Sequence, residues 1–474
     1  MPCHIKQTKL DMSFISIEFV ALLSCCFLTF HLTRNNYRKY ILLLGSSLFI
    51  GYYHITFLVI AFLITLFTFY WGKIIQNAKN EKKAQLIHLV GIGALVGCWI
   101  AFRYAGKVIN DTNWLIPLGI SFYTFQAIAY LTEVYWKEEK AESSLVDFTL
   151  YMLLFMKFLS GPIERSADLL PQLKKIETPS YETIVYGLKL ITIGLIKKLI
   201  IADRIAPYTS NIFSTAESAS GAQLLATWLL YPIELYTDFS GYTDMAIGVA
   251  MLFGIQLFPN FNRPFVAQTI TDLWRRWHLS LSFWVRDYLY MPLTSATRQW
   301  GQWGIYVSLL LTFTALGIWH GAGWNFVVYG LIQGFVIIYE LKTQTLRTQI
   351  KDKVGSFFYS FYFILRTYTI FALSLLFFRT NSIKDALYFI NHISFQTHNN
   401  LKELKIGMSD HECIIAGSAI FLILVYEYFM SKKDLLKMLA HQPALVRWII
   451  YYLLLFALLT FGKFNTENFI YLQF

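Results

Sequence analysis

The stretch WGIYVSLLLTFTALGIWHGAGWNFVVYGLIQGFVIIYEL, residues 303–341, decides the fold. It holds two apolar runs, residues 303–319 and 324–341, separated by His320 and a glycine-rich turn. A membrane-spanning helix needs about 20 predominantly apolar residues, so each run approaches the length of a span. Glycines on both sides of His320 allow a helix break, which in membrane proteins opens backbone toward a cavity. The stretch therefore predicts two membrane helices with one ionisable side chain at their junction.

The rest of the chain has the same character. Of its 474 residues, 56% are hydrophobic and only 15% are charged, whereas soluble proteins carry about 25% charged residues. This composition excludes a water-soluble globule and makes the lipid bilayer the first partner. Since no internal repeat of the transporter kind is visible, we expect one domain over residues 1–474.

The separable apolar runs predict roughly eleven to thirteen helices that cross or enter the bilayer. We therefore expect an all-α polytopic membrane protein. Besides the two runs above, the apolar segments are residues 13–32, 40–53, 55–70, 86–102, 114–136, 148–159, 184–201, 357–378, 413–429 and 446–461.

The charges indicate membrane topology. Forty Lys and Arg against 29 Asp and Glu leave a net charge of +11, but the cations cluster between apolar runs, as positive-inside loops do, so no nucleic-acid partner is expected. Basic residues flank residues 13–32 on both sides. We therefore expect residues 1–11 to be a misassigned start or a weakly ordered extension, with Met12 as the alternative to Met1. The cysteines lack metal-like spacing, so no metal site is expected.

Two groups of polar residues interrupt the apolar runs. Tyr123, Gln126, Tyr130 and Glu133 recur at helical spacing on one face, which fits either hydrogen bonding between helices or a substrate cavity. A second group comprises the acids Glu234, Asp238 and Asp244, which need partners or a wet cavity. We expect at least one of these acids to pair with a downstream arginine, the candidates being Arg263, Arg275, Arg276 and Arg286.

Two of the ten histidines are candidates for chemistry. His320 could accept a proton or simply hydrogen-bond between helices. His278 lies in residues 272–280, where Trp and Arg alternate as in a helix at the membrane surface. The arginines there are either a membrane edge or an anion site, for an acidic carrier protein or the phosphates of a thioester donor.

These motifs resemble those of the membrane-bound O-acyltransferase family, and especially its bacterial branch of alginate and peptidoglycan O-acetylation proteins. The resemblance is specific over residues 115–335, which we take as the catalytic core. The matching motifs are residues 161–165, 170–173, 238–246, 262–265, 272–282, 286–290 and 319–324, with weaker matches at 378–386 and 469–474.

The resemblance implies helices around a central funnel and acyl transfer, by default of acetyl, across the bacterial cytoplasmic membrane. The donor would be a cytoplasmic thioester, acetyl-CoA or an acyl carrier, with no tightly bound cofactor. The acceptor would be an extracytoplasmic polysaccharide, with a separate extracytoplasmic transferase as partner. His320 would be the essential histidine and His278 the second characteristic one.

Substrate-binding positions are expected around these motifs, namely Trp319, Asn325, Arg275, Arg276, Asp238, Asp244, Tyr123 and Gln126. Asn325 and backbone amides of the glycine turn could stabilise a developing oxyanion. Two positions depart from the family pattern: Thr294-Ser295 replaces a Gly-Gly pair, and Gln333 stands where a second histidine is common.

Two other functions remain open at this level. An ion- or proton-coupled transporter would use the intramembrane acids as ion sites. A non-catalytic scaffold would instead assemble a polysaccharide-modifying complex, with residues 379–412 as the binding loop.

Overall fold

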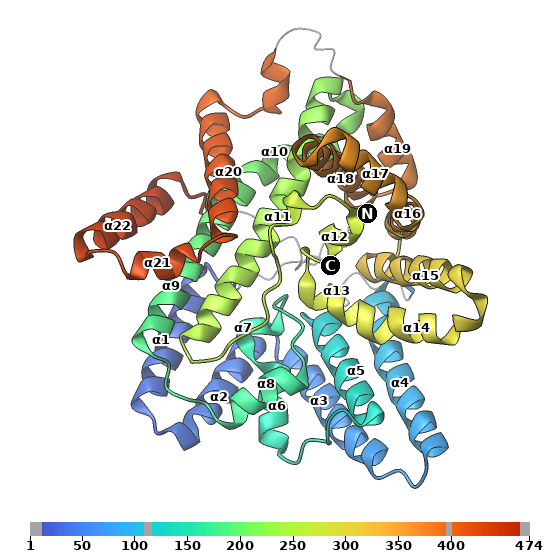
Figure 1. The fold of residues 1–474 in the computed structure, drawn as a ribbon. Coiled ribbons are helices and arrows are strands. Elements are labelled where there is room, and N and C mark those ends of the chain that lie inside the picture. The colour runs from blue at the N-terminus through green and yellow to red at the C-terminus, as the bar shows by residue number, and fades with distance from the viewer. Residues whose placement is uncertain (1–11, 109–115, 395–400, 465–474) are drawn as a thin grey trace. The chain divides into compact units, whose positions relative to one another are not determined.

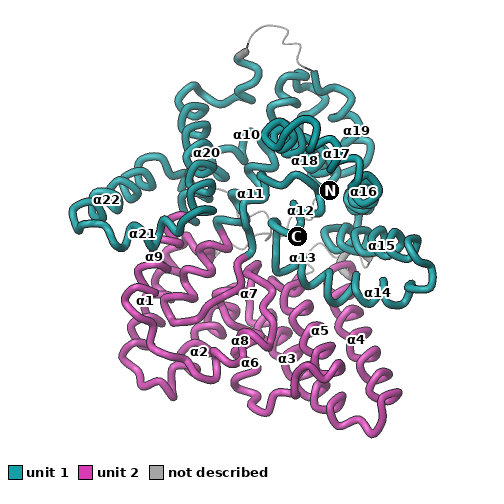
Figure 2. Tube along the Cα trace, viewed as in Figure 1, with its two compact units in different colours: residues 1–2, 194–241, 260–474 teal, residues 3–193, 242–259 magenta. Residues whose placement is uncertain are grey.

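The computed structural model describes residues 12–108, 116–394 and 401–464, and over these residues it is helical with no strand (Figure 1). The expected all-α fold is therefore confirmed. The expectations for residues 1–11 and 469–474 lie outside the described residues. The chain divides into two compact units (Figure 2).

Unit 2 comprises residues 3–193 and 242–259. Its helices are α1 (Ile17–Leu32), α2 (Asn35–Tyr53), α3 (Ile55–Gln76), α4 (Glu81–Val108), α5 (Ile120–Trp136), α6 (Leu145–Leu153), α7 (Phe155–Phe158), α8 (Ser166–Lys174) and most of α9 (Tyr181–Leu195).

Unit 1 comprises residues 194–241 and 260–474, with residues 1–2. Its main helices are the π-helix η1 (Ile196–Ala202), α10 (Asp203–Ser214), most of α11 (Gly221–Met251), α12 (Ile270–Trp274), α13 (Leu279–Val285), the π-helix η4 (Arg286–Tyr290), α14 (Met291–Ala296), α15 (Gln302–His320), α16 (Trp324–Lys342), α17 (Gln344–Val354), α18 (Ser356–Arg379), α19 (Ile383–His392), α20 (Asp410–Met430), α21 (Leu435–Ala440) and α22 (Ala444–Phe461). Short 3₁₀ turns complete it, namely η2 (Ala216–Ser218), η3 (Pro264–Val266), η5 (Arg298–Trp300) and η6 (Leu401–Lys405).

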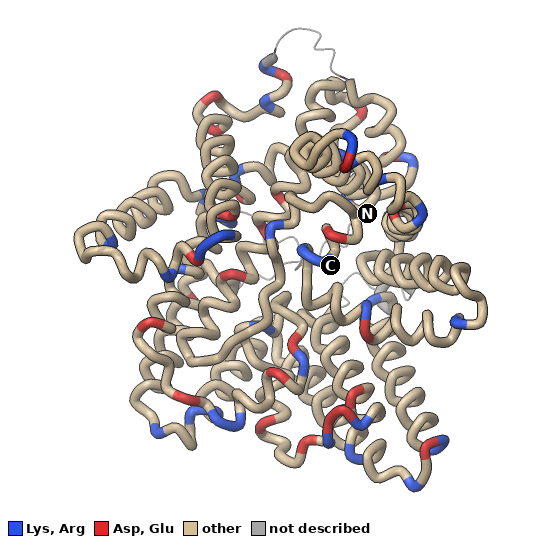
Figure 3. The backbone as a smooth tube through the Cα atoms, viewed as in Figure 1, with Lys and Arg blue, Asp and Glu red and all other residues tan. Residues whose placement is uncertain are grey.

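Seven helices of the described chain are long and apolar enough to cross a membrane: α3, α4, α15, α16, α18, α20 and α22. Figure 3 shows the charged residues mostly at helix ends and in loops. The seven are fewer than the eleven to thirteen expected from the sequence. Some expected spans are short, and α11 carries three acids within its apolar part.

The apolar run 148–159 is the clearest correction. It is not one helix, because α6 ends at Leu153 and α7 covers only Phe155–Phe158. At the break, the Phe155 N–H donates to the Ser46 hydroxyl at 3.1 Å, and both residues are buried. The segment is thus an interior piece of unit 2 and not a single span.

The polar stripe of α5 is buried and mostly bonded to other segments of unit 2. Gln126 accepts from the Lys157 ammonium at 2.9 Å, and the Tyr130 hydroxyl accepts from the Glu142 N–H at 2.8 Å. Glu133 pairs with Arg165 at 3.3 Å and accepts from the Ser166 hydroxyl. Hydrogen bonding between segments therefore accounts for three of the four stripe residues.

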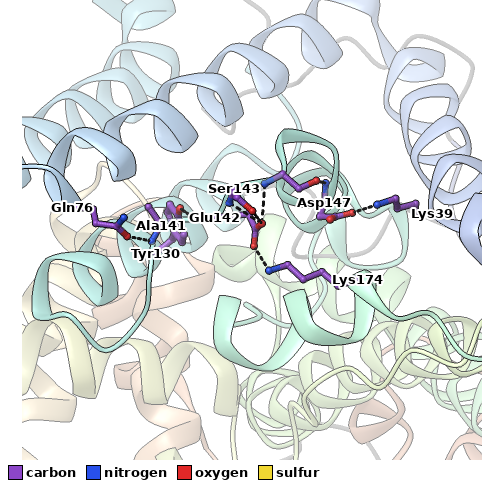
Figure 4. Close-up of polar contacts among 9 residues, drawn as sticks. Lys39, Gln76, Tyr130, Ala141, Glu142, Ser143, Asp147 and Lys174 are labelled. Carbon is purple, nitrogen blue, oxygen red and sulfur yellow. Dashed lines mark hydrogen bonds and ion pairs between the residues drawn. The ribbon is translucent and has the colours of Figure 1, made fainter.

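Glu142 orders the polar loop that follows α5 (Figure 4). One carboxylate oxygen accepts from the N–H groups of Ser143 and Ser144 at 2.8 and 2.9 Å, and the other lies 2.6 Å from the Lys174 ammonium. Burial alone would raise the pKa of Glu142, but Lys174 and the two backbone N–H groups outweigh it and hold the pKa below its ordinary value.

The α15–α16 pair in unit 1 is packed backbone to backbone. A methyl group built on Gly317 would lie 2.2 Å from the Phe326 carbonyl oxygen, and one on Gly330 would lie 2.1 Å from the Phe313 carbonyl oxygen. Small residues permit this close approach of membrane helices. The two expected spans at residues 303–319 and 324–341 are thereby confirmed as adjacent helices.

Glu142 should make the stability of the fold depend on acid. Because its folded-state pKa is lowered, its contribution is full above the pKa of the unfolded chain and is lost as the pH falls through the folded value. We expect Glu142→Gln to flatten the fall in melting temperature below about pH 5. Glu177→Gln, which alters an exposed pair with Lys175, should leave the acid profile unchanged.

Gly330→Ala should destabilise the protein by about 1–3 kcal/mol, because the added methyl group overlaps a carbonyl oxygen that cannot move away easily. The melting temperature in detergent should fall by several degrees. Gly417→Ala on α20 is the matched control, since a methyl group there meets no atom within 4 Å. An equal response of the two variants would contradict the close packing.

Candidate active site

His320 is the last residue of α15, and its ring is held among aromatic rings. Ring centroids of Trp319, Phe378 and Tyr329 lie 4.6, 5.0 and 6.0 Å from that of the imidazole. His320 is 3% exposed, whereas Trp319 is partly exposed. The arrangement fixes the ring in one orientation and leaves Trp319 as the neighbour that faces outward.

The helix stops at His320 because the backbone of Gly321 is extended. A side chain at Gly321 would overlap the ring of Phe326, since a methyl group there would lie 2.1 Å from it. The tight turn before α16 therefore needs glycine for space. This is the break that the sequence predicted.

Asn325 has a different partner from the predicted one. Its amide nitrogen donates to the carbonyl oxygens of Phe377 and Thr380 at 3.0 and 2.8 Å. Both N–H groups are thus engaged at the end of α18, so donation to a substrate oxyanion would require one of these bonds to open. Asn325 holds α16 to the segment that carries Phe378, and in this geometry it is a positioning residue.

Further along the same face of α16, Gln333 and Glu340 bind α12. Gln333 accepts from the Trp274 indole N–H at 3.2 Å and donates to the Ser374 hydroxyl at 2.7 Å. It thus uses one acceptor and one donor, as a neutral histidine can. This explains how glutamine serves where the resemblance suggested a histidine.

Glu340 is 2% exposed and fixes the start of α12. Its two carboxylate oxygens accept from the N–H groups of Ile270 and Thr271 at 3.0 and 3.3 Å, and Arg366 on α18 lies 3.2 Å away. A carboxylate at a helix N-terminus satisfies N–H groups that have no partner within the helix. Glu340 therefore joins α12, α16 and α18, a role that was not predicted because the residue lies within the apolar run 324–341.

His278 follows α12 and has the left-handed backbone conformation, with φ of 46°. This conformation is uncommon for residues other than glycine and costs on the order of 1–3 kcal/mol. The surrounding loop holds it there: Asn260 accepts from the N–H groups of Leu279 and Ser280, and Asn262 donates to the Arg276 carbonyl.

The His278 ring is 1% exposed and lies 4.7 Å from the ring of Phe239. Burial lowers the pKa of His278 to about 3, so the imidazole is neutral near pH 7. Its neighbour Trp277 packs against Phe371 of α18 at 5.1 Å. Phe371 and Phe378 are two turns apart, about 10 Å along the helix axis, so both histidine sites rest on α18.

The predicted anion-binding arginines are at the surface of this loop. Arg275 is exposed, and Arg276 pairs with Asp272 at 3.0 Å. An anionic group would therefore reach Arg275 directly and would compete with Asp272 for Arg276.

Two of the three acids have described partners that were not among those expected. Asp238 lies 2.6 Å from the Lys198 ammonium, which also contacts Asp203 at 2.8 Å, and all three are buried. Glu234 accepts from the Thr209 hydroxyl at 2.5 Å. The cation described at Asp238 thus comes from upstream in the chain, whereas the sequence pointed to downstream arginines. Lys198 was not predicted as this partner because it lies, with Lys197, near the end of the apolar run 184–201, where lysines commonly flank a span.

The remaining candidates belong to unit 2. Asp244 is partly exposed, and Tyr123 is buried with its ring 5.5 Å from that of Phe158. The Tyr123 hydroxyl has no hydrogen-bond partner among the described residues. No three His, Cys, Asp or Glu side chains of the described segments come together as metal ligands would.

Replacing Glu340 should loosen α12 and the His278 loop. Glu340→Ala leaves Arg366 and two backbone N–H groups without their acceptor, and breaking such a buried pair costs about 3–5 kcal/mol. Amide exchange over residues 270–278 should accelerate and the melting temperature should fall. Glu138→Ala, in the polar loop after α5, is the control and should change neither. Unchanged exchange in the Glu340 variant would contradict the anchoring role.

Comparison with known proteins identifies the family. The model of the MBOAT, membrane-bound O-acyltransferase family matches residues 137–379, a range that includes both histidines. The probable alginate O-acetylase AlgI of Azotobacter vinelandii is 34% identical over 341 residues, which are 68% of this chain and 67% of that protein.

Two further relatives are named for other activities. The peptidoglycan O-acetyltransferase of Helicobacter pylori is 32% identical over 338 residues, 64% of each chain. The teichoic acid D-alanyltransferase of Bacillus subtilis is 34% identical over 227 residues, 46% of this chain and 57% of that protein. The family predicted from the motifs is confirmed: the chain belongs to the membrane-bound O-acyltransferase family.

Proposed function

We propose that this multi-pass membrane enzyme moves an acyl group, by default acetyl, from a cytoplasmic thioester donor to hydroxyl groups of an extracytoplasmic polysaccharide. The relatives named for O-acetylation support this choice of acyl group and acceptor. The bacterial cytoplasmic membrane is then the compartment.

The position of His320 in the α15–α16 pair carries the proposal. Arg298 precedes α15 and Lys342 ends α16, so the cations lie at the end opposite to His320. Cytoplasmic loops are enriched in such cations. Nineteen helical residues rise about 28 Å, close to the thickness of the hydrocarbon core. This supports an extracytoplasmic approach of the acceptor hydroxyl to His320.

In the proposed reaction, the acceptor oxygen attacks the acyl carbonyl carbon while a ring nitrogen of His320 takes the hydroxyl proton. The bond between the acyl carbon and sulfur breaks, and the proton passes to the leaving thiolate. General-base catalysis of this kind contributes about 10²–10⁴ in rate. Trp319 offers a partly exposed ring face to the substrate, and Asn325 and Phe378 position the imidazole.

The donor side of the proposal uses the His278 loop. Exposed Arg275 could bind a phosphate of acetyl-CoA or an acidic surface of an acyl carrier protein. The thioester is a co-substrate, and the free thiol leaves after transfer. An extracytoplasmic transferase is the proposed partner, and it would bring the polysaccharide hydroxyl to this membrane enzyme.

No observation favours the two alternatives from the sequence. A transporter would need hydrated carboxylates as ion sites, but Asp238 is paired with Lys198 and Glu234 is bound by Thr209. A scaffold would keep its function without His320, and the experiment below distinguishes it.

His320→Ala or His320→Gln should lower transfer of labelled acetyl into envelope polysaccharide by at least about 100-fold, because the proton acceptor is lost. The variants should fold, as judged by melting temperature and gel filtration. His441→Ala, which alters an exposed histidine, is the control and should retain transfer. A folded His320 variant with full transfer would refute the catalytic role.

A further inference from the structure

The short helix α17 is exposed to its surroundings along its whole length. It has 11 residues, and none of them is buried by the described parts of the chain. Isolated helices shorter than about 12–15 residues are marginal in water. Its residues Leu346, Ile350 and Val354 are 54, 36 and 51% exposed. A surface outside the chain would therefore add to its stability.

The residues of α17 indicate the chemistry of the surface that it would contact. At about 100° per residue, Leu346, Ile350 and Val354 form an apolar stripe about 80° wide. Arg347 and Lys353 flank the stripe on its two sides, about 60° from its centre. A lysine in such a place extends its charged end to headgroups while its stem covers apolar surface, whereas Arg347 donates to the Glu340 carbonyl oxygen.

The opposite face of α17 is polar and holds the only acid of the helix, Asp352. A helix that carried its acid beside the stripe would be repelled by an anionic layer, whereas here the acid is turned away. Three cations, Arg347, Lys351 and Lys353, accompany the apolar stripe. The charge pattern therefore fits an anionic, partly apolar surface.

The neighbours of α17 place it at the membrane boundary. Single residues, Thr343 and Gly355, join it to the spanning helices α16 and α18. Arg347 donates to the Glu340 carbonyl oxygen near the end of α16. Phe357 and Phe358, at the start of α18, are 74 and 66% exposed. Because both of its ends are tied to spans, α17 stays at the membrane surface where α16 ends and α18 begins.

We propose that α17 lies in the plane of the cytoplasmic headgroup layer and binds anionic phospholipid. The apolar stripe enters between the acyl chains, and Lys351 and Lys353 contact lipid phosphates. This site is separate from the proposed acyl transfer and does not depend on it.

The test is amide exchange of the full chain in nanodiscs. One set contains phosphatidylcholine alone and the other an equal mixture with phosphatidylglycerol. Exchange over residues 346–354 should be slower in the anionic discs. Each lysine near an anionic surface strengthens binding about fivefold, so Lys351→Gln with Lys353→Gln should remove a slowing of roughly 25-fold.

The matched control is Lys82→Gln with Lys83→Gln, which neutralises two exposed lysines at the start of α4. It should leave the exchange of α17 unchanged. Equal exchange of α17 in the two lipid mixtures would overturn the proposal, as would a full anionic effect in the Lys351 and Lys353 variant. Slowing by free glycerol phosphate in phosphatidylcholine discs would also overturn it, because it would indicate a simple phosphate site.

Discussion

The buried carboxylate of Glu340 is the constraint on which the geometry of the two histidine sites depends. A charged group without water needs both a counter-ion and hydrogen-bond donors, and Glu340 finds them on two other segments, Arg366 on α18 and the first N–H groups of α12. The same face of α16 bonds to α18 through Asn325 and Gln333. The polar residues of α16 thus align α18, which carries Phe378 beside His320, with α12, which leads to His278.

The parts of this arrangement that could be predicted from sequence are those set by local pattern. The run 357–378 corresponds to α18, and the loop 379–412 contains α19. The break after His320 followed from its glycines. The prediction of a single span over residues 148–159 was wrong. Apolar composition does not reveal the helix break at Leu154, where the Phe155 N–H donates to the Ser46 hydroxyl.

Long-range pairing was the part that sequence could not provide. Asp238 was expected to need a partner or a wet cavity, and the partner described is Lys198, which lies in the π-helix η1. A π-helical turn changes which side chains face inward and frees backbone carbonyls, and the Leu199 carbonyl indeed accepts from the N–H of Lys463 beyond α22. Spacing rules for an ordinary α-helix do not anticipate either contact. Asn325 was predicted to bind substrate. Its two partners, the carbonyl oxygens of Phe377 and Thr380, are more than fifty residues away in the sequence and could not be recognised from it.

The glycine contacts between α15 and α16 also restrict how molecules can reach His320. At Gly317 and Gly330 the two backbones approach so closely that even a methyl group does not fit. A fatty chain or a sugar is far wider than a methyl group, so neither can slip sideways through this seam. This seam of the hairpin is therefore closed, and any donor or acceptor must reach the imidazole by a route that does not pass between α15 and α16.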